Sequence, residues 1–347
     1  MQSAGNEVRK PRIALAIGDP AGIGPELAAR MAADPEVNEA VSLTIVGDGR
    51  VLERGAREAG IGLFLGRPGG PRIHELANFD PGTTRLGVAA EAGGRSALSN
   101  FRTCLEMAGG GEADAVCFTP FNKAAMKLGD PSYEDEISFA LRILGLPGPA
   151  SEFNVLDGLW NARVTSHVPL SKVAGLITEA SVLRGIRLTD ASMRAASFGE
   201  PRIAVAALNP HAGDGGNFGH EDDEVIRPAV DAAQRAGIHA EGPFPSDTVF
   251  LRATKGAYDA VLTMYHDQGQ IAMKLLGFER GVTLLGGFPF PICTPAHGSA
   301  YDIAGQGVAH PGATRNALLL AARIAAAQRD AVQHHRIGLN ASDRRGA

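Results

Sequence analysis

Cysteine and aromatic residues are scarce in this chain of 347 residues, and long apolar runs are absent. The three cysteines, Cys104, Cys117 and Cys293, are scattered and form no CxxC pair, which excludes a disulfide framework and favours a reducing compartment. No apolar stretch approaches the roughly 20 residues that span a bilayer. The stretch "MQSAGNEVRK" has no apolar signal core. We therefore expect a cytoplasmic protein with no membrane partner.

Excess positive charge is also lacking. Lysine and arginine number 33 against 38 aspartate and glutamate, so the formal net charge is −5. No basic stripe interleaved with aromatic residues occurs, which argues against nucleic acid as a partner. Glycine is abundant, with 44 residues, and suits many tight turns between strands and helices. The length of the chain indicates two domains.

Strand-like and helix-like segments alternate along the chain. Apolar runs predict strands at 12–18, 42–49, 114–120, 172–178, 202–208 and 258–266. Helix-like patterns occur at 24–34, 50–60, 221–237 and 313–332. This alternation predicts a parallel α/β architecture with helices packed on the sheets. In such sheets the ligand binds beyond the carboxyl ends of the strands.

Three of the ten histidines lie at expected strand ends among polar residues: His167 in "TSHVPL", His211 in "NPHAGDGG" and His266 in "MYHDQG". Neutral imidazoles are good ligands for zinc, manganese, cobalt or iron, and magnesium suits them least. Three protein ligands would leave coordination positions open for a substrate. The spacing of these histidines is wide, so hydrogen-bonded structural histidines remain an alternative reading of the residues alone.

Seven motifs occur in the order found in the 4-hydroxythreonine-4-phosphate dehydrogenase family, which the sequence therefore resembles from about Arg12 to about Ala326. They are "GDPAGIGPE", "PFNKAA", "TSHVPL", "NPHAGDGG", "GPFPSDTVF", "YHDQGQIAMKLLGFERGV" and "HGSAYDIAGQG". The resemblance implies that His167, His211 and His266 bind one divalent metal ion. It also implies a homodimer in which two of these ligands come from one subunit and the third from its partner.

The same resemblance implies a two-domain fold like that of isocitrate and isopropylmalate dehydrogenases. Parallel-rich sheets would be flanked by helices, with the active site in the cleft between domains. We expect the first domain at 11–128 plus 301–335 and the second, with the dimer contact and the metal site, at 129–300. Residues 1–10 and 336–347 are expected to be flexible tails.

The glycine-rich stretch "HGSAYDIAGQGVAHPGA" is similar to the adenosine-binding loop of isopropylmalate and isocitrate dehydrogenases. The resemblance implies cofactor contacts from His297, Gly298, Ser299, Ala300 and Asp302. A carboxylate at 302 would bond ribose hydroxyls and repel a 2′-phosphate, so NAD is expected in preference to NADP. A purely structural glycine-rich loop is the alternative. By contrast, "GDPAGIGPE" lacks a GxGxxG pattern and indicates a tight strand-to-helix turn.

The residues at the expected substrate-binding positions differ from those of the family. A His-Thr pair of the family is replaced by acids in "SYEDEIS", among them Asp135 and Glu136, while Thr283 and Ile292 stand in place of an asparagine and an arginine. Among the family's substrate contacts in the last third of the chain, only the lysine is retained, as Lys274. The loss of a guanidinium that grips phosphate, together with added acids, predicts a substrate without phosphate.

The resemblance implies metal-dependent, NAD-linked oxidation of a secondary alcohol in a hydroxy acid, followed by decarboxylation of the β-keto acid. Asp247 and Asp267 are candidates for proton transfer or for orienting a ligand, and Lys274 for pairing with a substrate anion. Hydrogen-bonded turn acids and a solvated helix lysine are the alternatives. Two other functions remain open: a terephthalate-type cis-dihydrodiol dehydrogenase and a non-catalytic metabolite-binding paralogue.

Overall fold

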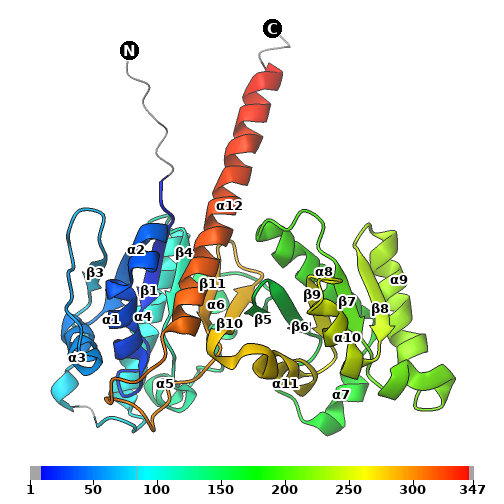
Figure 1. Cartoon of the computed structure of the whole chain (residues 1–347), viewed down its shortest axis with the longest axis horizontal. Helices are drawn as coiled ribbons and strands as arrows, with labels where there is room; N and C mark the ends of the chain where they lie inside the picture. The colour runs from blue at the N-terminus through cyan, green and yellow to red at the C-terminus, as the bar shows by residue number, and fades with distance from the viewer. Residues whose placement is uncertain (1–8, 84, 344–347) are drawn as a thin grey trace. The chain divides into compact units, whose positions relative to one another are not determined.

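The computed structural model describes residues 9–83 and 85–343 and divides the chain into two compact units (Figure 1). Of the described residues, unit 1 comprises 9–83, 85–146, 290–294 and 298–343, and unit 2 comprises 147–289 and 295–297. Among the residues described, no helix is both long and apolar enough to span a membrane.

Unit 1 contains a parallel sheet in the order β3-β2-β1-β4-β11. The strands are β1 (Arg12–Ala16), β2 (Ser42–Gly47), β3 (Arg72–Glu75), β4 (Ala115–Phe118) and β11 (Ile292–Pro295). The helices are α1 (Gly24–Ala33), α2 (Pro35–Ala40), α3 (Gly49–Ala59), α4 (Glu91–Gly109), α5 (Lys123–Gly129), α6 (Glu136–Leu144) and α12 (Gly312–Asp343), with a short 3₁₀ turn at Pro81–Thr83. Its inner strands are almost wholly buried, as expected for a parallel sheet covered by helices.

Aromatic rings hold α6 in unit 1. Phe101 of α4 lies 4.9 Å from Phe118 of β4 and 5.7 Å from Phe139 of α6, measured between ring centroids. All three side chains are at most 3% exposed. This packing places residues 129–146 in unit 1, whereas the sequence alone led us to begin the second domain at 129.

Unit 2 contains a mixed sheet in the order β10-β5-β6-β9-β7-β8. The strands are β5 (Ser151–Leu156), β6 (Leu159–Arg163), β7 (Ile203–Ala206), β8 (Ala240–Phe244), β9 (Ala260–Thr263) and β10 (Val282–Gly286). The helices are α7 (Leu170–Leu176), α8 (Glu179–Ala195), α9 (Arg227–Arg235), α10 (Ser246–Ala253) and α11 (His266–Gly277). Short 3₁₀ segments occur at Pro210–Gly216 and Phe278–Arg280, and a π-helical turn at Asp222–Ile226. The pairs β6-β9, β9-β7 and β7-β8 are parallel, while β10-β5 and β5-β6 are antiparallel.

The α/β prediction is confirmed, but one predicted strand is wrong. Residues 172–178 belong mostly to α7, in which Val173 is buried while Leu170 and Leu176 are exposed. Six strands were not predicted: β3, β5, β6, β8, β10 and β11. Of these, β5 and β6 form a hairpin. Its turn, Asp157-Gly158, has positive φ at both positions (49° and 91°), as a two-residue hairpin turn requires.

Residues 9 and 10 of the expected N-terminal tail contact other residues of unit 1. Residues 1–8 and 344–347 of the expected tails lie outside the described residues. Within the described part, Arg9 contacts Asp114 and Lys10 donates to the carbonyl of Asn38. The helix α12 continues through Asp343, beyond the residue 335 at which we expected the first domain to end.

Candidate functional site

Polar groups gather where three neighbouring parallel strands of unit 2 end. His167 follows β6, His266 follows β9 and His211 follows β7, and these strands are adjacent in the order β6-β9-β7. Arg163 is in register with Thr263, so the strands β6 and β9 end at the same level of the sheet. Figure 1 shows α7 and α11, which begin just after β6 and β9, at the same end of this unit.

His167 and His266 lie side by side. Their ring centroids are 5.6 Å apart and the ring planes are tilted by 43°. Nδ1 of His266 lies 2.6 Å from Oδ1 of Asp267, and since a carboxylate only accepts, the imidazole donates from Nδ1. In a neutral ring this contact would leave Nε2 as the nitrogen that can bind a metal ion. The His167 ring is exposed and the His266 ring about one-third exposed, so both are accessible from outside the chain.

His211 stands on a strained loop. Five consecutive residues, 211–215, have positive φ, and the values for His211, Ala212 and Asp214 are 54°, 56° and 46°. Each such non-glycine residue costs roughly 1 kcal/mol or more, and such strain is found preferentially at functional sites. The fully buried carboxylate of Asp222 stabilises the entry to this loop by accepting from the backbone N–H groups of Leu208 and Asn209.

These three histidines do not come together in one chain. Within residues 9–83 and 85–343, no three His, Cys, Asp or Glu side chains are close enough to hold a metal ion. His211 instead has its ring centroid 6.1 Å from that of Phe218, and both side chains are exposed. The structure therefore brings together two of the three predicted ligands.

The two candidate acids share a cavity of about 500 Å³ between α10 and α11. Asp247 lies in the first turn of α10, and Asp267 in the first turn of α11. The rest of the lining is largely apolar and includes Leu251, Ile271 and Leu275, which are 61%, 60% and 84% exposed. Acids and a wide apolar face therefore occur next to His266.

Lys274 lies on α11, two helical turns after His266, and its side chain is exposed. It lines a small recess of about 20 Å³ together with Asn154 and Gln270. Thr283 of β10 is directly opposite Asn154 of β5 and is half-buried. Two of the predicted substrate contacts therefore lie close to the same asparagine.

The other predicted substrate contacts have evident structural roles in unit 1. The carboxylate of Asp135 caps α6 by accepting from the N–H of Ser138 at 2.7 Å. Glu136 lies 3.7 Å from Lys123, in an ion pair in which the glutamate is mostly buried. Ile292 is fully buried as the first residue of β11, in register with Val116.

The predicted cofactor loop, as far as it belongs to unit 1, packs on the start of α1. The carbonyl of Ser299 accepts from the N–H of Ile23 at 3.0 Å. The buried carboxylate of Glu26 accepts from the N–H of Ala309 at 3.0 Å, and Tyr301 donates a short hydrogen bond to Asp19. Burial raises the pKa of Asp19, although the bonds from Tyr301 and Ala21 oppose that shift.

Glycines in this loop serve the packing of the protein itself. A Cβ at Gly307 would lie 2.2 Å from the carbonyl oxygen of Glu58, and one at Gly305 would lie 2.5 Å from Leu86. Both residues also have positive φ. Gly298 differs, since a Cβ there would meet nothing within 4 Å. The side chain of Asp302 is exposed on this loop, and Ala300 has a φ of 43°.

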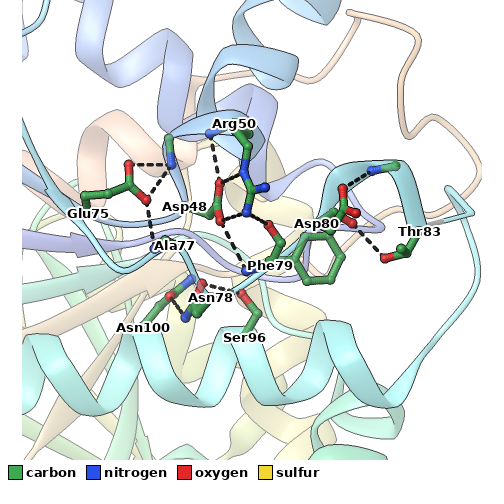
Figure 2. Close-up of polar contacts among 12 residues, drawn as sticks. Asp48, Arg50, Glu75, Ala77, Asn78, Phe79, Asp80, Thr83, Ser96 and Asn100 are labelled. Atoms are coloured by element: carbon green, nitrogen blue, oxygen red, sulfur yellow. Dashed lines mark hydrogen bonds and ion pairs between the residues drawn. The ribbon is translucent and has the colours of Figure 1, made fainter.

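A polar network anchors the segment that supports this loop (Figure 2). The buried carboxylate of Asp48 accepts from the N–H of Phe79 at 3.1 Å and from the guanidinium of Arg50, which in turn donates to the carbonyl of Phe79. Further along the same segment, Gly87 donates to the carbonyl of Ala21 at 2.9 Å. Leu86 of this segment lies next to Gly305 of the predicted cofactor loop.

Sequence reasoning missed Arg163, a buried cation at the end of β6. Its guanidinium contacts Glu152, Asn154 and Ser166, and its side chain is 2% exposed. The available signal was the Asp-Gly pair in "FNVLDGLWNARV", which predicts a hairpin with its last strand ending at this arginine.

These observations define the class of protein: an α/β protein of two units, with imidazoles and carboxylates at the carboxyl ends of parallel strands. The family described as "Pyridoxal phosphate biosynthetic protein PdxA" matches residues 39–321, and the chain belongs to this family. The resemblance that the sequence motifs indicated is thereby confirmed.

Three similar proteins illustrate the relationship. One of Rhizobium meliloti (strain 1021), named "Putative 4-hydroxythreonine-4-phosphate dehydrogenase 2", is 54% identical over 335 residues, covering 94% of this chain and 96% of that one. The structure of a 4-hydroxythreonine-4-phosphate dehydrogenase from Klebsiella pneumoniae has a TM-score of 0.81 at 30% identity, covering 91% and 100%. A terephthalate 1,2-cis-dihydrodiol dehydrogenase from Burkholderia xenovorans LB400 has a TM-score of 0.64 at 28% identity, covering 91% and 98%.

The relatives are named as dehydrogenases, and the chain is accordingly a dehydrogenase, an oxidoreductase that acts on a CH–OH group. The prediction of an enzyme of this type is confirmed.

Proposed function

We propose that this protein catalyses the metal-dependent, NAD-linked oxidation of a secondary alcohol in a hydroxy acid, followed by decarboxylation of the resulting β-keto acid. The observation that carries the proposal is the placement of His167, His266 and His211 after three adjacent parallel strands in a member of the PdxA family. The carboxyl ends of such strands are where α/β enzymes bind their ligands.

The histidine pair fits a shared metal ion. Two imidazoles bound to one ion at about 2.1 Å have ring centroids roughly 5 to 6 Å apart, and those of His167 and His266 are 5.6 Å apart. The contact between His266 and Asp267 also suits a ligand whose second nitrogen is held by a carboxylate. In this proposal His211 completes the set from a second copy of the chain. Zinc, manganese and cobalt suit three imidazoles better than magnesium.

The exposed histidines and the apolar face beside them support a homodimer. Leu251, Ile271 and Leu275 expose most of their side chains on α10 and α11, next to the cavity that Asp267 lines. Contiguous apolar surface of this kind is typical of protein interfaces. A dimer contact here would bring a second copy close to the histidine pair.

The bound metal would lower the pKa of the substrate hydroxyl and stabilise negative charge as carbon dioxide leaves. Residues of the chain would orient the ligand, accept the proton and bind the substrate anion. Asp267 orients the His266 ring, and Asp247, in the same cavity, is the candidate that accepts the hydroxyl proton. Lys274 pairs with an anionic group of the substrate. Together these residues would fix the substrate with its C–H bond towards the nicotinamide.

We assign NAD as the preferred cofactor because Asp302 is exposed on the loop that resembles an adenosine-binding site. The accessible carboxylate would accept two ribose hydroxyls and repel a 2′-phosphate. His297, Gly298, Ser299 and Ala300 are the proposed neighbours of the adenosine. Of these, Ser299 also has a structural role, since its carbonyl bonds Ile23.

The proposed substrate has no phosphate. Ile292 is buried and apolar, so position 292 offers no guanidinium. Asp135 and Glu136 are acids in place of a polar pair, and Lys123 pairs with Glu136. Thr283 replaces a longer amide. A hydrogen bond to a charged group contributes roughly 1.5 to 3 kcal/mol, so the loss of two lowers affinity for phosphate by about a hundredfold or more.

A phosphorylated hydroxy acid is the second candidate, because relatives carry the name 4-hydroxythreonine-4-phosphate dehydrogenase. A terephthalate-type dihydrodiol is the third candidate, because a solved dehydrogenase of that kind is 28% identical over 91% of this chain.

Turnover with matched substrates tests the proposal. The holoenzyme with NAD is given 4-hydroxythreonine 4-phosphate, unphosphorylated 4-hydroxythreonine and a panel of other hydroxy acids, and NADH absorbance is recorded. The proposal expects an unphosphorylated acid to give the highest kcat/KM. A kcat/KM of about 10⁴ M⁻¹s⁻¹ or more for the phosphate ester would contradict it. Absence of NADH formation with every acid would favour the non-catalytic alternative.

A further inference from the structure

A buried arginine of unit 2 lies four residues before His167 in the chain. Arg163 ends β6 and is 2% exposed, and its pKa is lowered because burial disfavours its charge, although Glu152 opposes that effect. A guanidinium is rarely buried without a compensating role, because burial of a charge is costly unless it is paired and hydrogen-bonded. Here each of the three guanidinium nitrogens has a hydrogen-bond partner.

Each nitrogen of Arg163 contacts a different group. Nε donates to Oγ of Ser166 at 3.1 Å, Nη1 donates to Oδ1 of Asn154 at 3.0 Å, and Nη2 forms a short ion pair with Glu152. Ser166 directly precedes His167 in the chain. The planar guanidinium therefore links the strand β5 to the backbone that carries one of the two histidines.

A second branch of the same network reaches the other histidine. Oδ1 of Asn154 also accepts from Nε2 of Gln270 at 2.9 Å, and Gln270 lies on α11, one helical turn after His266. Arg163 and Gln270 thus share one acceptor atom. The network joins the segment of His167 to the helix that begins with His266, and on the same helix it reaches the recess beside Lys274.

Backbone contacts reinforce this coupling. Thr165 donates both its N–H and its hydroxyl to the carbonyl of Met264, which lies two residues before His266. Gly269 packs so closely on Asn161 that a Cβ would lie 2.0 Å from the amide oxygen. The start of α11 is therefore closely packed against β6.

We infer that Arg163 is a positioning residue: its fork to Ser166 and Asn154 fixes the separation of His167 and His266 and so determines the affinity of the metal site. The inference rests on the proposed function, which supplies the metal. It adds a residue that touches neither metal nor substrate, and it explains why a fully buried cation ends the strand that leads to His167.

The test uses the full-length protein and Ser166→Ala, Arg163→Lys and Arg163→Met variants. Ser166→Ala removes one contact of the fork without removing the charge. Arg202→Lys is the matched control, because Arg202 makes a similar fork to Asp259 at the opposite, amino ends of β7 and β9. Zinc affinity is measured by competition with a chelator, and thermal stability by calorimetry.

The inference expects Ser166→Ala and Arg163→Lys to bind zinc about 10- to 100-fold more weakly, as is usual for groups behind metal ligands. Arg202→Lys should bind zinc like the wild type. If Arg163→Met fails to fold, Ser166→Ala still decides the question. Zinc affinity within twofold of the wild type in Ser166→Ala and Arg163→Lys would overturn the inference.

A readout without metal separates this inference from the proposed function. Nuclear magnetic resonance of ¹³C-labelled histidine rings should show the His167 and His266 resonances moving in Ser166→Ala and staying in place in Arg202→Lys. If the wild type binds no zinc, the proposed function fails, and these resonances still test the positioning role. Unmoved resonances in Ser166→Ala would contradict it.

Discussion

His167 and His266 lie with their ring centroids 5.6 Å apart although 98 residues separate them in the chain. The parallel register of β6 and β9, in which Arg163 pairs with Thr263, brings them together. Each histidine then follows its strand by three or four residues. Their proximity thus arises from strand order, and it is the geometric basis for the predictions on metal and assembly.

Metal content should depend on these rings. The purified protein should carry about one divalent ion per subunit, and His266→Ala or His211→Ala should lose most of it, because two imidazoles alone bind weakly. His239→Ala is the control, since His239 is exposed beside the amino end of β8, away from the strand ends that carry the three histidines. Elemental analysis after dialysis measures the ratio. Full occupancy in a triple variant of His167, His211 and His266 would exclude the site.

Cofactor choice should depend on Asp302. The wild type is expected to prefer NAD, and Asp302→Asn should narrow the ratio of NAD to NADP affinity by about tenfold, equivalent to about 1.4 kcal/mol. The physical reason is the repulsion between a carboxylate and a 2′-phosphate. Fluorescence titration gives both dissociation constants, and Glu39→Gln, an exposed acid on α2, is the control. A wild type that prefers NADP would show that the loop has another role.

Assembly and metal binding should be lost together. Leu275→Glu places a charge on an apolar face where the side chain is 84% exposed, so the monomer should tolerate it while a dimer contact would not. Leu128→Glu, at a residue that is 53% exposed on α5 of unit 1, is the matched control. Light scattering gives the mass and elemental analysis the metal. A Leu275→Glu protein that stays dimeric with full metal would place the interface elsewhere.

The Asp48 network should stabilise unit 1 in a pH-dependent way. The hydrogen bond from Arg50 holds the pKa of Asp48 below its usual value, although burial opposes that effect. A carboxyl whose folded pKa is lowered contributes stability above its unfolded pKa, and this contribution is lost as the pH falls through the folded value.

Asp48→Ala should therefore lower the free energy of unfolding by about 1 to 2 kcal/mol at pH 7. The difference from the wild type should be constant at neutral pH and shrink only below about pH 4. Urea unfolding at several pH values measures it. Glu75→Ala, which removes another acceptor of the network in Figure 2 at an exposed position, is expected to cost less. A difference that grows on acidification would contradict the assignment.

Local patterns in the sequence were sufficient for the alternation of strands and helices and for the family. The strand 12–18 and the helix 24–34 follow directly from apolar periodicity, and both occur as β1 and α1. The run 172–178 was misread because only Val173 and Ile177 are buried in it. These two residues lie four apart, which is the spacing of one helix face, and the residues between them are exposed.

The sequence by itself determined which residue types stand beyond the strand ends, because His167, His211 and His266 follow their strands by three to five residues. Only the tertiary structure decided which of them meet, since strand order depends on packing between segments distant in the chain. It also showed that Glu136 pairs with Lys123 and that Ile292 is buried. The tertiary structure also decided the contacts of Arg163 with Glu152, Asn154 and Ser166. A buried charge is stable only where the fold brings its partners together from several elements.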